Sequence, residues 1–245
     1  MKLRKLVLSA ILSAMAIVLN EFVSIRIPPS NTLFTFSLGI IPIFFIAYYC
    51  GVVYSTISAV IIDILGWVIG GTANPFNIGF TLNALLSGLI IGLALLFKKQ
   101  LSSKLGKILI AVIESLVTVI TIPLFIYFFN KFGLAAKYNL SYASLIISTL
   151  AIAFNLLFVI YSIALPDNED NNAVNIGFQV YQITVSLFLT PLWVHSLYGT
   201  NYISLWSMRL ISVPVLTFTY SLIVLLILRS LTKIYKAGHF NEKKR

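Results

Sequence analysis

Residues able to act as acids, bases or metal ligands are few in this chain. Its 245 residues include seven Asp and Glu in total, two His and one Cys. His195 and His239 lie far apart, and the sequence contains no phosphate-binding loop, zinc-protease motif or nucleophile elbow. An enzyme normally needs a paired acid and base or an activated nucleophile. The sequence therefore predicts a protein that is not an enzyme and that needs no metal or cofactor.

Three acids, Glu21, Asp63 and Glu114, nevertheless lie within or at the edge of apolar runs. Acids inside a membrane commonly form a proton relay, which here would use Asp63 and Glu114. Asp63 also lies near a loop and is followed by Gly66, a setting more typical of a hydrogen-bonded helix end. The sequence favours this second interpretation of Asp63 and offers no account of Glu114.

The elements that must hold these residues are membrane spans. The chain is 59% hydrophobic and 10% charged, with a mean hydropathy of +0.99, whereas soluble domains have about 25% charged residues. Because a helix crosses the bilayer with about 20 apolar residues, the chain has room for about eight helices and for no sizeable soluble domain. We predict an all-α, polytopic transmembrane bundle in which residues 1–245 form a single integral membrane domain.

Apolar runs with breaks at their ends predict the spans at residues 6–23, 37–50, 51–69, 78–97, 107–129, 141–165, 174–195 and 209–232. The second and third are hard to separate, because the alternative is one long tilted helix with a turn at Cys50-Gly51. Basic clusters precede the first span and follow the fourth, and cytoplasmic loops carry such clusters. Only an even number of crossings between the two clusters puts both in the cytoplasm, so we expect two separate spans.

The net charge of +10 and the pI of 9.7 arise from basic clusters that flank apolar runs, which indicates membrane topology and not nucleic-acid binding. The first apolar run continues to Val23, which favours a retained helix over a cleaved signal peptide. We predict a multi-pass protein of the cell membrane with both termini in the cytoplasm. The acidic stretch Asp167-Asn-Glu-Asp170 then lies inside. The loops 24–36, 70–77, 130–140 and 196–207 lie outside.

Three of the four outer loops could line a ligand pocket, and the first of them contains Arg26 and Pro28-Pro29. The second begins the stretch Asn74-Pro-Phe-Asn-Ile-Gly-Phe-Thr-Leu-Asn83, where amides and the free N–H groups of a helix start can meet a ligand. Asparagine caps of that helix are the alternative interpretation. Near the last loop, Trp193, Tyr198 and Trp206 precede Arg209. An interfacial aromatic belt with an arginine anchor would have the same pattern.

Several short motifs follow one another in an order that resembles a known family. They are Phe36-Ser-Leu-Gly-Ile-Ile-Pro42, Cys50-Gly51 with Asp63-Ile-Leu-Gly66, Gly79-Phe-Thr-Leu-Asn-Ala-Leu-Leu-Ser-Gly88, Thr190-Pro-Leu-Trp193 with Leu197-Tyr-Gly199, and Met208-Arg209-Leu210. Together they resemble the folate-type substrate-binding subunit, or S component, of energy-coupling factor (ECF) vitamin transporters. The basic start followed by Ala10-Ile-Leu-Ser-Ala14 also resembles these subunits.

The resemblance implies a high-affinity, membrane-embedded vitamin-binding subunit with a six-helix core. It would work with a transmembrane coupling subunit and two cytoplasmic ATPases. Because eight spans are predicted here, we expect two extra spans, inserted at residues 125–176. The small residues Ala10 and Ala14 would form the face that meets the coupling subunit. In this chain Asn20-Glu21 occupies the position where the family pattern suggests a Ser-Arg-like pair.

Folate has a flat aromatic ring at one end and carboxylates at the other, so its pocket needs stacking faces, amides and a cation. The resemblance together with the loop chemistry gives the candidate ligand-binding residues Arg26, Asn74, Phe76, Asn77, Phe80, Thr81, Trp193, Tyr198 and Arg209. Three alternatives remain: an S component for another vitamin or a nucleobase, a proton-coupled secondary transporter that uses Asp63 and Glu114, and a membrane-bound enzyme. The missing acid–base pairs disfavour the enzyme.

Overall fold

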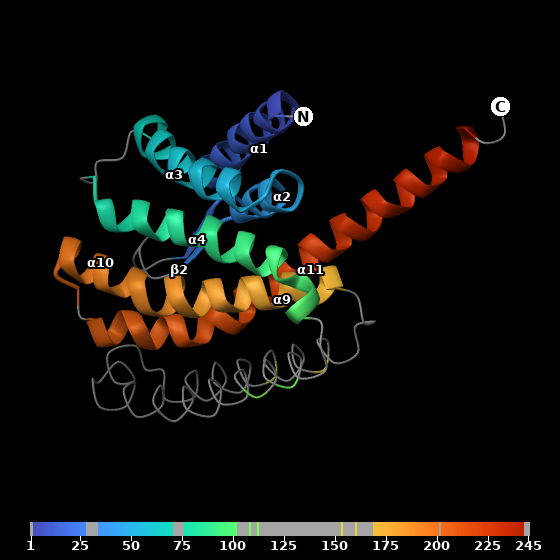
Figure 1. The fold of residues 1–245 in the computed structure, drawn as a ribbon. Helices are drawn as coiled ribbons and strands as arrows, with labels where there is room; N and C mark the ends of the chain where they lie inside the picture. The colour runs from blue at the N-terminus through green and yellow to red at the C-terminus, as the bar shows by residue number, and fades with distance from the viewer. Residues whose placement is uncertain are drawn as a thin grey trace.

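The computed structural model is a bundle of helices that pack side by side, with a short β-hairpin near one end (Figure 1). It describes residues 2–27, 34–70, 76–101, 169–200 and 202–242, and four isolated positions between 108 and 160. The predicted spans at 107–129 and 141–165 and most of the predicted insertion at 125–176, together with Glu114, lie outside the described residues.

The amino-terminal half contains four longer helices and the hairpin. They are α1 (Lys2–Phe22), β1 (Ile25–Ile27), β2 (Phe34–Phe36), α2 (Ile40–Cys50), α3 (Val52–Ile69) and α4 (Ile78–Leu96), followed by the short α5 (Lys98–Leu101). The two strands are antiparallel, with Arg26 opposite Thr35. Both strands lie in the segment 24–36, which the sequence predicts as an outer loop.

The described residues of the carboxyl-terminal half, 169–200 and 202–242, form two long helical segments. The first runs through α9 (Glu169–Tyr181), the π-helix η1 (Gln182–Leu189) and α10 (Thr190–Tyr198). The second is α11 (Tyr202–Glu242). Among the described helices, five are long and apolar enough to cross a membrane, with α9–η1–α10 counted as one of them, and α2 is a shorter apolar helix. The predicted helical membrane bundle is confirmed.

The boundary between α2 and α3 is a glycine turn. Gly51 has φ +102°, a conformation that other residues adopt only with strain, and its N–H donates to Ile46 O and Ala47 O at 3.3 and 3.1 Å. The chain therefore forms two separate helices here, as the charge pattern predicted, and not one long helix.

Small residues let α3 and α4 approach closely. A Cβ added at Gly88 would lie 2.5 Å from Ser55 O, and one added at Gly92 would lie 2.9 Å from Val52 Cα. The Ser55 hydroxyl donates to Gly88 O at 2.9 Å. Membrane helices commonly associate through small residues in this way, since lipid provides little hydrophobic drive. Around this pair, a core that includes Phe44, Phe178 and Tyr220 joins α2 to α9 and α11.

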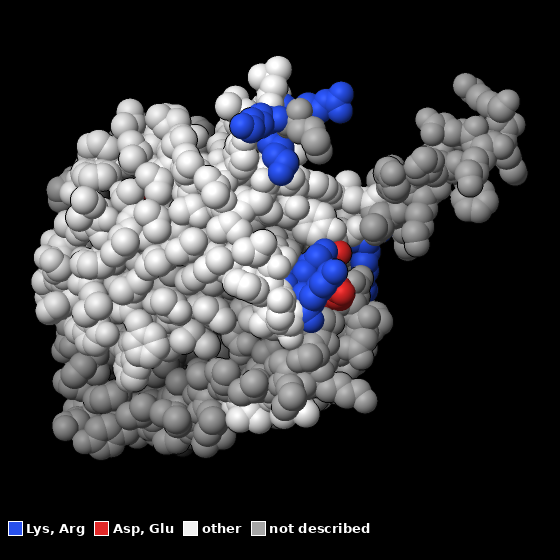
Figure 2. Space-filling view, viewed as in Figure 1, with Lys and Arg blue, Asp and Glu red and all other residues white. Residues whose placement is uncertain are grey.

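Polar contacts of the basic residues gather at one end of the bundle. Lys5 Nζ donates to Cys50 O at 3.2 Å, while Lys98 Nζ pairs with Asp170 Oδ1 at 2.8 Å. The Tyr48 hydroxyl, close to Cys50 on α2, donates to Asp170 Oδ2 at 3.1 Å. Figure 2 shows the lysines and arginines of this face in two separate groups toward the same end of the bundle. The two basic clusters therefore lie at one end, as the predicted topology requires, and Asp170 lies there too; we call this the basic end.

Candidate functional site

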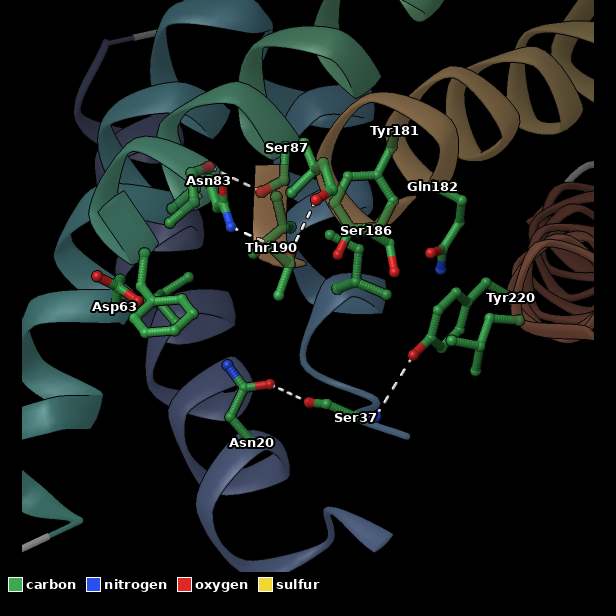
Figure 3. Close-up of a pocket in the computed structure, with 18 of the residues that line it drawn as sticks. Asn20, Ser37, Asp63, Asn83, Ser87, Tyr181, Gln182, Ser186, Thr190 and Tyr220 are labelled. Atoms are coloured by element: carbon green, nitrogen blue, oxygen red, sulfur yellow. Dashed lines mark hydrogen bonds between the residues drawn. The ribbon is translucent and has the colours of Figure 1, made fainter. Parts of the chain in front are cut away.

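A cavity of about 270 Å³ lies inside the bundle between α1, α2, α3, α4, the α9–η1–α10 segment and α11. Its described aromatic and charged lining residues are Phe80, Tyr181, Tyr220, Asp63 and Arg209. Its polar uncharged lining residues are Asn20, Ser37, Asn83, Ser87, Gln182, Ser186 and Thr190 (Figure 3). Such a mixture of apolar walls with a few convergent polar groups is typical of a site for an organic ligand.

The cavity lies toward the end of the bundle opposite the basic residues. Asn20 is in the last turn of α1, whereas Lys5 is in its first turns. Phe80 and Asn83 follow the start of α4, whereas Lys98 follows its end. The lining residues of α1 and of the start of α4 therefore lie away from the basic end.

A hydroxyl on α4 holds the cavity acid on α3. Thr81 Oγ1 donates to Asp63 Oδ2 at 2.8 Å. Asp63 is thus hydrogen-bonded, as the favoured sequence interpretation expected, but it also lines the cavity, where its Oδ1 has no hydrogen-bond partner among the described residues.

The Asn83 amide joins α4 to α10. Its Nδ2 donates to Thr190 Oγ1 at 3.1 Å, and its Oδ1 accepts from Trp193 Nε1 at 3.1 Å. Gly79 allows this contact, since a Cβ at that position would collide with the Trp193 indole. Trp193 therefore packs behind the cavity wall and touches it through Asn83.

Hydrogen bonds made by Ser37 link α1 to α11 at the cavity wall. The Ser37 hydroxyl donates to Asn20 Oδ1, and the Ser37 N–H donates to the Tyr220 hydroxyl at 3.4 Å. Figure 3 shows Asn20 and Ser37 on the side of the cavity away from Ser87 and Tyr181. The residue after β2 thus ties the hairpin to both helices.

The cation of the cavity is Arg209, on α11. Its Nη1 donates to the Ser186 hydroxyl at 2.9 Å. Within the described part of the chain, no carboxylate lies within ion-pair distance of Arg209, and Lys98–Asp170 is the ion pair found. A guanidinium has five N–H donors, so Arg209 keeps donors available for an anionic ligand group.

The π-helix η1 forms one wall of the cavity. Gln182, Ser186 and Thr190 recur every four residues, and all three line the cavity. Gln182 and Ser186 belong to η1, Thr190 is the first residue of α10, and π-helical turns are frequent at functional sites. Gln182 is 2% exposed, and its Oε1 has no hydrogen-bond partner among the described residues.

The predicted ligand-binding residues take different positions. Phe80 and Arg209 line the cavity, while Thr81 and Trp193 hold the lining residues Asp63 and Asn83. Asn77 caps α4 by accepting from Gly79 N at 2.7 Å, the alternative that the sequence left open.

The remaining predicted positions are not among the described lining residues. Phe76 is 45% exposed and lies edge-on to Trp67, and Tyr198 is 39% exposed at the end of α10. Arg26 is in β1, and Asn74 lies outside the described residues. Ala10 and Ala14 are exposed on α1, a helix whose buried residues are Ser9 and Ala16.

Several lining residues were missed from the sequence. They are Asn20, Ser37, Asn83, Ser87, Tyr181, Gln182, Ser186, Thr190 and Tyr220. Most are amides or hydroxyls inside apolar spans, where hydropathy hides them. The signal that would have found part of this set is the four-residue spacing of Gln182, Ser186 and Thr190, because polar groups at membrane depth must face protein or a cavity.

A membrane bundle with a mixed polar and aromatic cavity near one end defines a class of ligand-binding membrane proteins. Residues 4–227 match the family model described as "ECF transporter, substrate-specific component". The chain belongs to this family, and it is therefore a substrate-binding component of an ECF transporter.

The fold is also similar to a solved structure. The crystal structure of FolT bound with folic acid matches over 91% of this chain and 90% of that chain, with a TM-score of 0.55 and 17% sequence identity. At this identity the match shows a common fold. A search of the curated proteins finds no match to the chain.

Proposed function

We propose that this chain is the folate-binding subunit of an ATP-driven ECF uptake transporter. The observation that carries the proposal is the fold that the chain shares with FolT, whose structure contains folic acid. A second line of support is independent of the match. The cavity offers the three kinds of group that a folate needs, namely aromatic faces, amides and a cation.

In this proposal the folate ring lies between the aromatic and amide walls. Phe80, Tyr181 and Tyr220 provide ring faces for stacking, and Asp63 and Asn83 provide polar partners for the ring edge. Arg209 binds a carboxylate of the glutamate tail through its remaining N–H donors. The cavity of about 270 Å³ suits the ring system with part of the tail, since sites for drug-sized ligands span about 300–1,000 Å³.

A binding titration against a vitamin panel tests this proposal. The protein purified in detergent is titrated with folic acid, riboflavin, thiamine, biotin and guanine, and binding is followed by calorimetry. We expect tight binding of folic acid and weak or no binding of the others. Tight binding of another vitamin or of guanine, with none of folic acid, would replace folate by the alternative ligand class. Such an outcome would leave the family assignment intact.

The energy for uptake comes, in this proposal, from partner subunits. The sequence has no phosphate-binding loop of its own, so we propose a transmembrane coupling subunit and two cytoplasmic ATPases. The exposed small residues Ala10 and Ala14 on α1 allow another helix to approach closely. Co-expression with candidate partners should yield a complex that carries folate into vesicles only when ATP is supplied. A folate-binding subunit that transports alone, driven by a proton gradient, would contradict this part.

We also propose that both termini are cytoplasmic and that the cavity opens to the outside. The basic end includes Lys5 and Lys98, and basic clusters favour the cytoplasmic side. Reporter fusions at the two ends of the chain should both be active only in the cytoplasm. A reporter at either end that is active outside the cell would overturn this orientation.

A further inference from the structure

The orientation of the Asn83 amide is fixed by its two partners. An indole N–H can only donate, so the atom that faces Trp193 Nε1 at 3.1 Å must be the amide oxygen. Thr190 Oγ1 donates its one hydrogen to Val185 O at 2.8 Å, so toward Asn83 it can only accept. Its partner at 3.1 Å must therefore be the amide nitrogen. Both contacts require the same orientation, which removes the usual ambiguity of amide groups.

This arrangement leaves one hydrogen-bond donor for a ligand. Asn83 Nδ2 carries two hydrogens, and Thr190 accepts one of them. Asn83 is 8% exposed and lines the cavity, so the second N–H is available to a molecule inside. The fixed amide cannot turn to offer its oxygen instead, because that would break the contacts with both Trp193 and Thr190.

An acceptor lies on the same wall as this donor. Asp63 is held through Oδ2 by Thr81, which is two residues before Asn83 on α4. Figure 3 shows Asp63 and Asn83 on one side of the cavity, facing Gln182 and Tyr220 on the other. Asp63 Oδ1 has no hydrogen-bond partner in the described part of the chain. This side of the cavity therefore presents both a carboxyl acceptor and an N–H donor.

We infer that Asp63 and Asn83 recognise a lactam edge, a ring N–H next to a ring carbonyl, and that Trp193 and Thr190 are positioning residues for this pair. The inference rests on the proposed folate function and specifies which side chains bind the edge of the pteridine ring. In a 4-oxo pteridine such as that of folic acid, N3–H donates to Asp63 and the 4-oxygen accepts from Asn83. A 4-amino pteridine presents a bare ring nitrogen next to an NH₂ group, so its pattern of donor and acceptor is reversed.

Comparison of folic acid with aminopterin, its 4-amino analogue, tests the inference. Aminopterin would leave the buried hydrogen-bonding groups of Asp63 and Asn83 without matching partners. We therefore expect the wild-type protein to bind folic acid about 10- to 100-fold more tightly than aminopterin. In Trp193→Phe the Asn83 amide oxygen loses the indole N–H that donates to it. The amide can then turn, so that its oxygen accepts from the 4-amino group of aminopterin. We therefore expect folic acid to bind more weakly, aminopterin to bind more tightly, and the preference to fall below about threefold, or about 0.65 kcal/mol.

A matched control and a second variant make this test specific. Trp206 does not line the cavity, and its Nε1 has no hydrogen-bond partner among the described residues, so Trp206→Phe should keep the wild-type preference. Thr190→Val removes the acceptor on the nitrogen side and should also lower the preference, even if Trp193→Phe does not fold.

Three results would count against the inference. If Trp193→Phe weakens both ligands equally, Trp193 has a packing role and does not position Asn83. If the wild-type protein binds folic acid but shows no preference over aminopterin, the lactam reading is wrong while the proposed function stands. If the wild-type protein binds neither pteridine, the proposed function itself fails.

Discussion

Arg209 is the residue whose loss should affect ligand affinity most directly. It lines the cavity, and its Nη1 donates to Ser186 at 2.9 Å. Because no carboxylate pairs with it in the described part of the chain, an anionic ligand group would supply the missing partner. We therefore predict that Arg209→Ala weakens folate binding and that Arg209→Lys recovers only part of the loss, since lysine lacks the planar fork.

The size of the effect follows from the number of bonds available. One donor of Arg209 is occupied by the Ser186 hydroxyl, so a carboxylate would use one or two of the others. A hydrogen bond to a charged group contributes about 1.5–3 kcal/mol, and we expect a loss of about 2–3 kcal/mol, roughly 30- to 150-fold in the dissociation constant.

The assay is calorimetric titration of purified wild-type and variant proteins with folic acid and with 6-methylpterin, which lacks the glutamate tail and carries no carboxylate. The affinity for 6-methylpterin should change little on the substitution, because the carboxylate that Arg209 binds is absent. Arg229→Ala is a suitable control, since Arg229 is an exposed arginine of the same helix, toward its carboxyl end. If Arg209→Ala binds both ligands as the wild type does, Arg209 is an interfacial anchor, and the carboxylate contact should be sought at Arg26.

Three further predictions concern other parts of the chain. Replacing both Ala10 and Ala14 with Trp should leave folate binding intact but abolish ATP-driven uptake into vesicles, and loss of binding by the purified double variant would contradict this. Excising residues 125–168, with a linker that keeps the topology, should change the affinity for folic acid by less than about tenfold, or about 1.4 kcal/mol. The reason is that the described helices around the cavity pack directly on one another. Complete loss of folate binding in a folded protein would assign the excised segment to the site. Asn175→Leu should melt in detergent at or above the wild-type temperature, because Asn175 is 2% exposed and both of its amide atoms lack a hydrogen-bond partner among the described residues; a clearly lower melting temperature would contradict this.

The sequence predicts the helices well where hydropathy alone decides them. The predicted spans 51–69 and 78–97 correspond to α3 (Val52–Ile69) and α4 (Ile78–Leu96). In a bilayer every backbone polar group needs an internal partner, so an apolar run of sufficient length has little choice but a helix. The turn between α2 and α3 was predictable because a glycine coincides with the charge-parity requirement.

Boundaries were missed where a helix is polar but buried in protein. The span predicted to start at residue 174 begins at Glu169 in the structure. The prediction placed the start too late because Asp170, Asn171 and Asn172, in the first turns of the helix, lower the local hydropathy. Asn171 and Asn172 are 6% and 5% exposed. Similarly, α11 begins at Tyr202 and not at residue 209. Hydropathy cannot distinguish a polar residue that faces neighbouring helices from one that faces water.

The cavity was harder to predict than the helices, since its wall depends on which faces of distant segments meet. Phe80 and Arg209 could be found from loop chemistry because both lie near helix starts, away from the basic end. Gln182 and Tyr220 could not, because each lies in the middle of an apolar run and reaches the cavity only through the packing of η1 and α11 against the other helices.

The distribution of polar groups along the bundle also bears on how a binding subunit can be stable in a membrane. Buried polar groups are expensive in lipid unless they are partnered. At the basic end the partners are within the protein, since Asp170 accepts from both Lys98 and Tyr48. In the cavity, Asp63, Gln182 and Arg209 keep donors or acceptors without a partner among the described residues. A ligand that satisfies these groups would stabilise the fold as well as occupy the site, which links substrate binding to the stability of the same helices.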